Sequence, residues 1–90
     1  MKQSFNGPDI LSLQRIKTFK TLDSMVDGSR FLLISDGGSN IKILSVFWNG
    51  SRTVKSLFVE GTGALLPFDY FSDERLTDES MYVLSGKTKD

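Results

Sequence analysis

Neither cysteine nor histidine occurs in this sequence of 90 residues. The absence of cysteine excludes disulfide bonds, and the joint absence removes the commonest ligands of zinc and iron sites. Nucleophilic triads in their common forms need a histidine base, so we expect no catalytic residue, no metal, no cofactor and no enzyme. A small domain without cross-links often gains stability from association, which predicts a homo-oligomer.

Long apolar runs are also missing. The longest clean run, FLLI at residues 31–34, is far shorter than the ~20 residues that span a bilayer. The opening MKQSFNGPDI lacks the apolar stretch of a secretion signal, so we expect a cytoplasmic protein with no membrane partner. The short length predicts a single domain over residues 1–90, with flexible ends at 1–8 and 85–90.

Charge of one sign is not in excess, because 11 basic residues balance 11 acidic ones. The two signs are separated along the chain. Residues 1–59 carry eight Lys and Arg against four Asp and Glu, a sum of +4, whereas residues 60–90 carry three against seven, a sum of −4. The basic residues form no run, so the sequence lacks the electrostatic footprint of most nucleic-acid binders. The acidic C-terminal third suits a basic partner instead.

One short helix and one further helical turn are predicted. Thr18 caps the first, which extends over residues 19–27 with an apolar stripe on one side and Gly28 as its stop signal. Ser72 caps the second, a single turn over 72–76. Residues 9–17 fit either a strand or a helix, because their apolar positions satisfy both periods.

From residue 30 onward the apolar period changes to two, which predicts strands over 30–35, 40–48, 51–60, 64–71 and 81–84. RFLLIS, the first of these strands, is apolar on both faces and is therefore expected at the centre of a sheet. Pro67 places its strand at an edge or a bulge. We predict a mainly β (α+β) fold: one short N-terminal helix plus an antiparallel five-strand meander or SH3-like small barrel. An open sheet crossed by the helix is the alternative.

The only tryptophan, Trp48, precedes Asn49-Gly50, the strongest short-range hairpin signal in a sequence. A two-residue turn at this point places Trp48 opposite Ser51 and Phe47 opposite Arg52. Phe47 and Trp48 then point to opposite faces of the sheet, so one of them belongs to the core. The other is free to cover a flank, to enter a subunit interface or to contact a ligand. The sequence leaves open whether Trp48 is buried or exposed.

TFKTLDSMVDGSRF, at residues 18–31, resembles an opening common in small bacteriophage proteins: a capped amphipathic helix, a glycine stop and a strand led by a basic residue. LLPFDYFSDERLTDESMYVL, at 65–84, resembles the C-terminal stretch typical of these proteins. The nearest family is the phage Thoeris anti-defence sponge proteins. The resemblance implies a small β-rich viral protein that assembles as an oligomer and sequesters a cyclic nucleotide signal. Phe31-Leu32-Leu33 and Met81-Tyr82 replace tryptophan-containing positions of that pattern, so no binding residue is carried over.

The leading hypothesis is a phage-encoded inhibitor that binds a host or defence protein directly and catalyses no reaction. Its anchors are an aromatic hairpin with a nearby arginine, because Trp and Arg are enriched at binding hot spots. Its acidic segment steers the association. The partner-binding residues predicted on this basis are Phe47, Trp48, Arg52, Asp73, Glu74 and Asp78.

Two alternatives stay open. An oligomeric sponge would hold a small nucleotide signal, such as a cyclic nucleotide, at a subunit interface, with Arg30, Lys42 and Arg52 as its ligand-binding residues beside the glycine turns. A small barrel can also bind single-stranded nucleic acid through aromatics interleaved with basic residues. The sponge predicts a bound small molecule, and the nucleic-acid binder predicts a steep dependence on salt.

Overall fold

The computed structural model describes residues 12–48 and 55–89, with the side chain of Trp48 outside that description. Antiparallel strands in these ranges form one six-stranded sheet, which confirms the mainly β prediction. The strands are β1 (Arg15–Ile16), β2 (Arg30–Ser35), β3 (Asn40–Trp48), β4 (Lys55–Val59), β5 (Leu65–Pro67) and β6 (Ser80–Ser85). The helices are α1 (Phe19–Asp23) and α2 (Asp73–Asp78), and two 3₁₀ turns are η2 (Asp36–Gly38) and η3 (Phe68–Tyr70).

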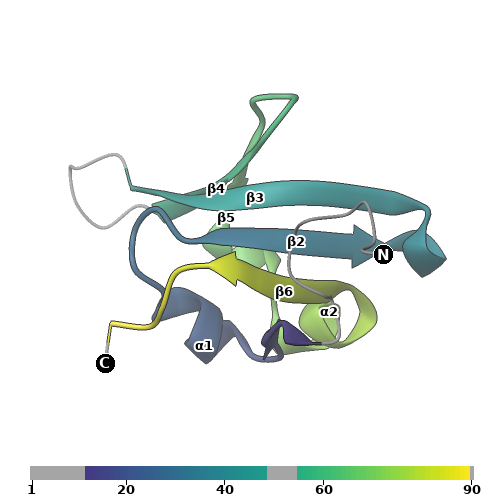
Figure 1. Ribbon diagram of the computed structural model, residues 1–90, viewed down its shortest axis with the longest axis horizontal. Helices are drawn as coiled ribbons and strands as arrows, with labels where there is room; N and C mark the ends of the chain where they lie inside the picture. Colours follow the sequence, from purple (N-terminus) through teal and green to yellow (C-terminus); the bar gives the residue numbers. More distant parts are fainter. Residues whose placement is uncertain (1–11, 49–54, 90) are drawn as a thin grey trace, which may run out of the picture.

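Strand β2 lies inside the sheet, between β6 and β3, as its doubly apolar sequence predicts (Figure 1). The strands β2 to β5 form a meander, and the chain then crosses back so that β6 pairs with the free side of β2. Of the ambiguous residues 9–17, Arg15 and Ile16 form β1 beside β6. The strand that contains Pro67, β5, lies at one edge, as predicted. Because β1 and β5 each pair with one neighbour, the described strands form an open sheet.

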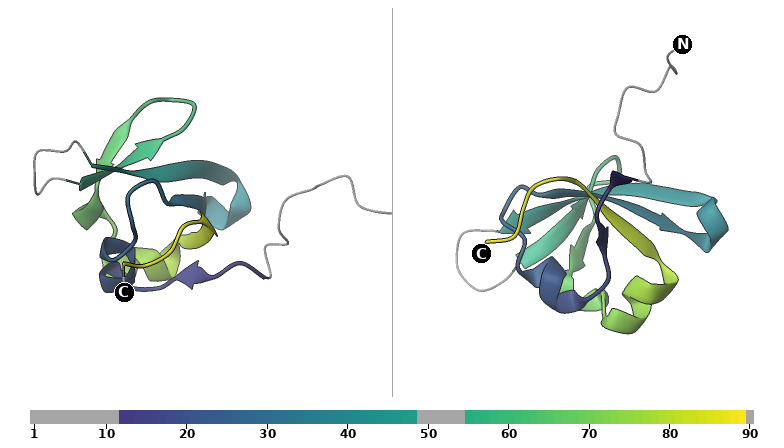
Figure 2. Two further views of the ribbon diagram at one scale, coloured as in Figure 1. Left: turned by 60° about the vertical axis from the view of Figure 1, so that its left-hand side comes forward. Right: turned by 60° about the horizontal axis from the view of Figure 1, so that its bottom comes forward.

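One face of the sheet, which we call the inner face, carries the hydrophobic core. Helix α1, turn η3 and helix α2 lie together on this side (Figure 2) and contribute Leu22, Phe68 and Leu76 to the core. Full burial of such a side chain stabilises the fold by about 1.5–3 kcal/mol. The buried apolar residues are Ile16, Leu22, Met25, Phe31, Leu33, Leu44, Val46, Leu57, Val59, Phe68, Phe71, Leu76 and Met81. The described residues therefore form a sheet with one face covered by helices.

Helix α1 is shorter than the predicted range 19–27. The Thr18 hydroxyl caps it as expected, accepting a hydrogen bond of 3.2 Å from the backbone N–H of Thr21. The helix ends at Asp23, because the next residues turn to pair with the end of the chain. The backbone N–H of Val26 donates to the carbonyl of Lys87 at 2.9 Å, and that of Lys89 donates to Ser24 at 2.8 Å. Residues 87–89, predicted as a flexible end, are thus bonded to the segment that follows α1.

The pairing of β3 with β4 differs from the predicted two-residue turn. Trp48 pairs with Lys55 instead of Ser51, so the connection is the whole segment 49–54, which lies outside the described ranges. The observed register sets the buried side chain of Leu44 opposite the buried side chain of Val59. The two-residue turn would have set Leu44 opposite a lysine. The apolar pattern therefore decides the register against the local turn signal.

Candidate functional site

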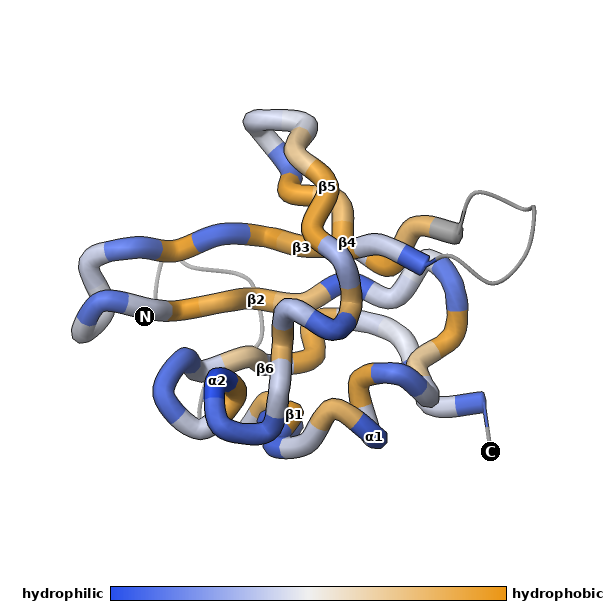
Figure 3. The backbone as a smooth tube through the Cα atoms, turned by 180° about the vertical axis from the view of Figure 1, so that it is seen from behind, coloured by the Kyte–Doolittle hydropathy of each residue, from blue (hydrophilic) through white to orange (hydrophobic). Residues whose placement is uncertain are grey.

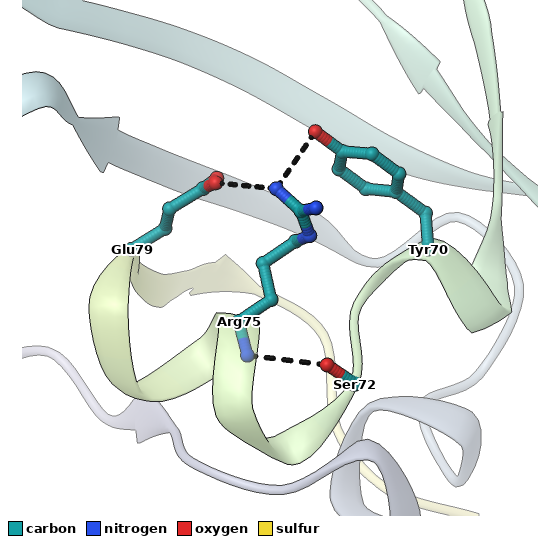
Figure 4. Close-up of polar contacts among 4 residues, drawn as sticks. All are labelled: Tyr70, Ser72, Arg75 and Glu79. Carbon is teal, nitrogen blue, oxygen red and sulfur yellow. Dashed lines mark hydrogen bonds and ion pairs between the residues drawn. The ribbon is translucent and has the colours of Figure 1, made fainter.

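Helix α2 holds the acidic residues that the sequence singled out. The Ser72 hydroxyl accepts a hydrogen bond of 3.2 Å from the backbone N–H of Arg75, which satisfies a free donor at the helix start (Figure 4). Asp73 and Glu74 occupy the first turn, where the helix dipole favours negative charge. Leu76 is fully buried, which fixes α2 on the inner side of the sheet. The predicted cap at residue 72 is confirmed.

Arg75 is held by two neighbours, one on η3 and one just after α2. Its Nη1 donates a hydrogen bond of 3.0 Å to the Tyr70 hydroxyl and one of 2.9 Å to the Glu79 carboxylate (Figure 4). Its guanidinium carbon also lies 4.0 Å from the centroid of the Tyr70 ring, which is a cation–π distance. The Tyr70 ring meets the buried ring of Phe71 edge-on at 4.9 Å. An arginine and a 41 % exposed tyrosine are thereby ordered at the surface.

A hollow of about 260 Å³ opens beside this cluster, lined by Ser72, Glu74, Arg75, Asp78 and Glu79. Its three carboxylates outnumber its one guanidinium, so the hollow carries a negative charge. We refer to these five residues together with Tyr70 as the α2 surface. In the described part of the chain, no group of three or more Asp, Glu, His or Cys side chains is placed to hold a metal ion. The surface instead offers carboxylate acceptors and an aromatic ring, which suit cationic groups of a partner.

Asp73 contributes to the fold and lies apart from the hollow. Its Oδ1 accepts a hydrogen bond of 2.7 Å from the backbone N–H of Phe19, the first residue of α1. The N–H groups at a helix start have no partner inside their own helix, so this carboxylate satisfies one of them. Asp73 therefore joins α2 to α1. Of the three predicted acidic residues, Glu74 and Asp78 lie on the α2 surface.

The predicted aromatic anchors lie away from α2. Phe47 follows the buried Val46 on β3, so its side chain points to the opposite face from the core, where it is exposed. Arg52 and the side chain of Trp48 are outside the described residues. Because α2 packs against the inner face, the structure does not bring Phe47 together with the acidic residues of α2.

The two described residues that were predicted to hold a nucleotide both have partners. Arg30 donates from Nε and Nη2 to the Glu60 carboxylate at 3.0 and 3.1 Å. These hydrogen bonds and the charge of Glu60 raise the pKa of Arg30. The Lys42 ammonium donates to the side-chain oxygen of Asn40 at 2.7 Å. The registers of β2 and β3 place Arg30 and Lys42 on opposite faces, so one copy does not bring them together.

The predicted site residues leave out four members of the α2 surface, Tyr70, Ser72, Arg75 and Glu79; Ser72 was predicted only as a helix cap. The pair of Arg75 and Glu79 had a readable signal, since residues four apart on a helix face each other. Tyr70 had none, because η3 and the bend after it decide where its ring lies.

No known protein family matches the chain, and neither does any curated protein or solved structure. The resemblance to phage anti-defence proteins thus stays a prediction that rests on the two quoted stretches. Among the helices of the described residues, none has the length and apolar character needed to cross a membrane.

Proposed function

We propose that this chain is a non-enzymatic binding protein that docks its α2 surface on a basic region of another protein. The observation that supports the proposal is the ordered pair of Tyr70 and Arg75 among the carboxylates of Glu74, Asp78 and Glu79. Tyrosine and arginine are enriched among the residues that dominate protein–protein binding energies. Both are partly accessible on this surface.

Side chains that are already ordered in the free protein favour tight association. Immobilising a flexible side chain at an interface costs about 0.5–1.5 kcal/mol. The Arg75 guanidinium is already fixed by its hydrogen bonds to Tyr70 and Glu79, so a partner would meet a side chain that has lost most of its freedom. The edge-on contact with Phe71 holds the tyrosine ring in the same way.

The charge of the α2 surface defines the partner that it suits. The Glu79 carboxylate is paired with Arg75, which leaves the exposed carboxylates of Glu74 and Asp78 as the source of its net negative field. Such charges at an interface rim raise the rate of association with a positively charged surface, and salt weakens this effect. We therefore propose a partner with Lys or Arg around its binding site.

A protein of this kind acts by covering part of its partner. We propose that the target is a host or defence protein whose own binding or active site is blocked. This agrees with the resemblance of residues 18–31 and 65–84 to stretches of small phage proteins. The sequence has no histidine or cysteine, and the α2 surface presents no activated nucleophile. Inhibition would thus depend on affinity alone.

The test is affinity capture from a bacterial lysate with the immobilised chain, followed by mass spectrometry of the retained proteins. Tyr70→Ala is expected to weaken capture of the retained partner by about tenfold or more, because it removes a hot-spot side chain and a support of Arg75. Glu74→Gln is expected to weaken capture less, and mainly at low salt. Asp36→Asn is the matched control, since it also removes one exposed negative charge but lies in η2.

Three results would contradict the proposal. The first is a wild-type chain that retains no protein. The second is a partner retained equally by the wild type, Tyr70→Ala and Glu74→Gln. The third is a tightly bound small molecule with no partner protein, which would favour the nucleotide sponge.

A further inference from the structure

The face of the sheet opposite the core, which we call the outer face, is unusually apolar. An antiparallel sheet with one face in water normally alternates apolar inward and polar outward residues. Here most outward positions are apolar as well, the exceptions on β2, β3, β4 and β6 being Arg30, Ser45, Ser56 and Ser80. Figure 3 shows the hydrophobic residues of β2 and those of β3, which hydrophilic residues interrupt. The strand registers place these side chains on the outer face: Leu32, Ile34, Ile41, Ile43, Phe47, Phe58, Leu65 and Tyr82.

Several of these side chains are open to solvent within the described part of the chain. The exposed fractions are 60 % for Ile41, 52 % for Leu65, 46 % for Phe47 and 37 % for Phe58. Contiguous apolar patches of this kind on soluble proteins mark sites of association. The outer face is therefore a surface that a second molecule can cover.

We propose that the outer face binds the outer face of a second copy, so that two sheets stack as a sandwich. Stacked sheets pack ~10 Å apart with strands within about 30° of each other, an angle that follows from the twist of each sheet. A second copy offers a sheet of the same twist and the same apolar side chains. A two-fold axis between the copies then sets each patch against itself.

Charge supports self-association. The only charged residue at an outward position of β2, β3 or β4 in the described ranges is Arg30, at the start of β2, and its partner Glu60 lies just beyond the end of β4. The pair can stay at the rim of a sandwich with its hydrogen bonds intact. The formal net charge of the chain is zero, so two copies do not repel each other at long range.

The size of the face sets the expected strength of the dimer. Strand β3 has nine residues, which corresponds to a length of ~30 Å, and the four strands from β2 to β5 span a width of ~19 Å. The other three strands have six, five and three residues, which reduces the usable area to about 370 Å² per copy in projection. Stable interfaces bury ~800 Å² per partner, and transient ones fall below ~600 Å². We therefore expect a dimer that dissociates on dilution.

The inference is independent of the proposed function, because α2 lies on the inner side of the sheet and stays free in the sandwich. The test is sedimentation velocity of the purified full chain over a wide range of concentrations. The wild type is expected to sediment as two chains at high concentration and as one after dilution. Phe58→Lys, which places a charge opposite Ser45 within the face, is expected to weaken the dimer by about tenfold or more.

Tyr70→Lys is the matched control, since it changes an aromatic residue of similar exposure on the inner side and should leave the dimer unchanged. Circular dichroism shows whether each variant is folded, and the milder Phe58→Ser replaces the lysine variant if that one unfolds. A wild type that is monomeric at every concentration would overturn the inference. So would a folded Phe58 variant that dimerises like the wild type, or a loss of the dimer in Tyr70→Lys equal to that in Phe58→Lys.

Discussion

At the scale of single residues, Gly86 shows how closely two distant segments meet in this fold. Gly86 follows β6 with a φ of +118°, and a Cβ atom built on it would lie 2.6 Å from Cβ and 2.9 Å from Cα of Ser29. Ser29 is buried, and its hydroxyl donates a hydrogen bond of 2.7 Å to the Val26 carbonyl. Its carbonyl accepts one of 2.8 Å from the N–H of Val46. The serine therefore has little freedom to move away.

Replacing Gly86 with alanine is expected to lower the free energy of unfolding by about 2–4 kcal/mol, because it adds an unfavourable φ to an overlap with a fixed neighbour. Urea unfolding followed by fluorescence measures the loss. Gly61→Ala is the control, since Gly61 also has a positive φ, +95°, but has nothing within 4 Å of the added Cβ. Equal losses in the two variants would show that the contact with Ser29 contributes nothing.

At the scale of helices and strands, the features that depend on near neighbours were predictable. The caps at Thr18 and Ser72 act within three residues, and each was read from the local sequence. The central place of β2 and the edge place of β5 follow from the composition of each strand. The sequence of each strand also shows that both of its faces contain apolar residues. The sequence alone does not show which strands pair, so it could not predict that their outward apolar side chains form one patch.

Features that depend on distant partners were not predictable. The apolar stripe after Thr18 continues to Val26, but the backbone there bonds to Lys87–Lys89 and ends α1 early. The Asn49-Gly50 signal gives way to the pairing of buried Leu44 with Val59. The sequence predicted Glu74 and Asp78 of the α2 surface but not Tyr70, because this tyrosine belongs to a different element, η3.

The contact between the two helices gives a prediction at this scale. Asp73→Ala is expected to lower the free energy of unfolding by about 0.5–2 kcal/mol, because the Phe19 N–H at the start of α1 loses its acceptor. Glu74→Ala, one residue further along α2, should change it by less than ~0.5 kcal/mol, since surface positions away from such contacts have small effects. Thermal or urea unfolding of both variants measures the difference. A more destabilising Glu74→Ala would refute the structural role of Asp73.

At the scale of the whole molecule, the two sides of the sheet differ in chemistry. The inner side is covered by α1, η3 and α2 and presents an acidic surface with an ordered Tyr–Arg pair. The outer side presents aliphatic and aromatic side chains, with the Arg30–Glu60 ion pair near its border. A small domain has a marginal core of its own, so covering the outer side would add stability. The resulting dimer would carry two α2 surfaces that face away from each other.

The measurement that tests this two-sided account most directly is native mass spectrometry of the chain with the partner captured by its α2 surface, at concentrations where the free chain is dimeric. We predict an assembly of two chains with two partner molecules, reduced to one chain with one partner in Phe58→Lys. An assembly of one wild-type chain with one partner would contradict the account. It would mean that the partner and the second copy compete for the same face.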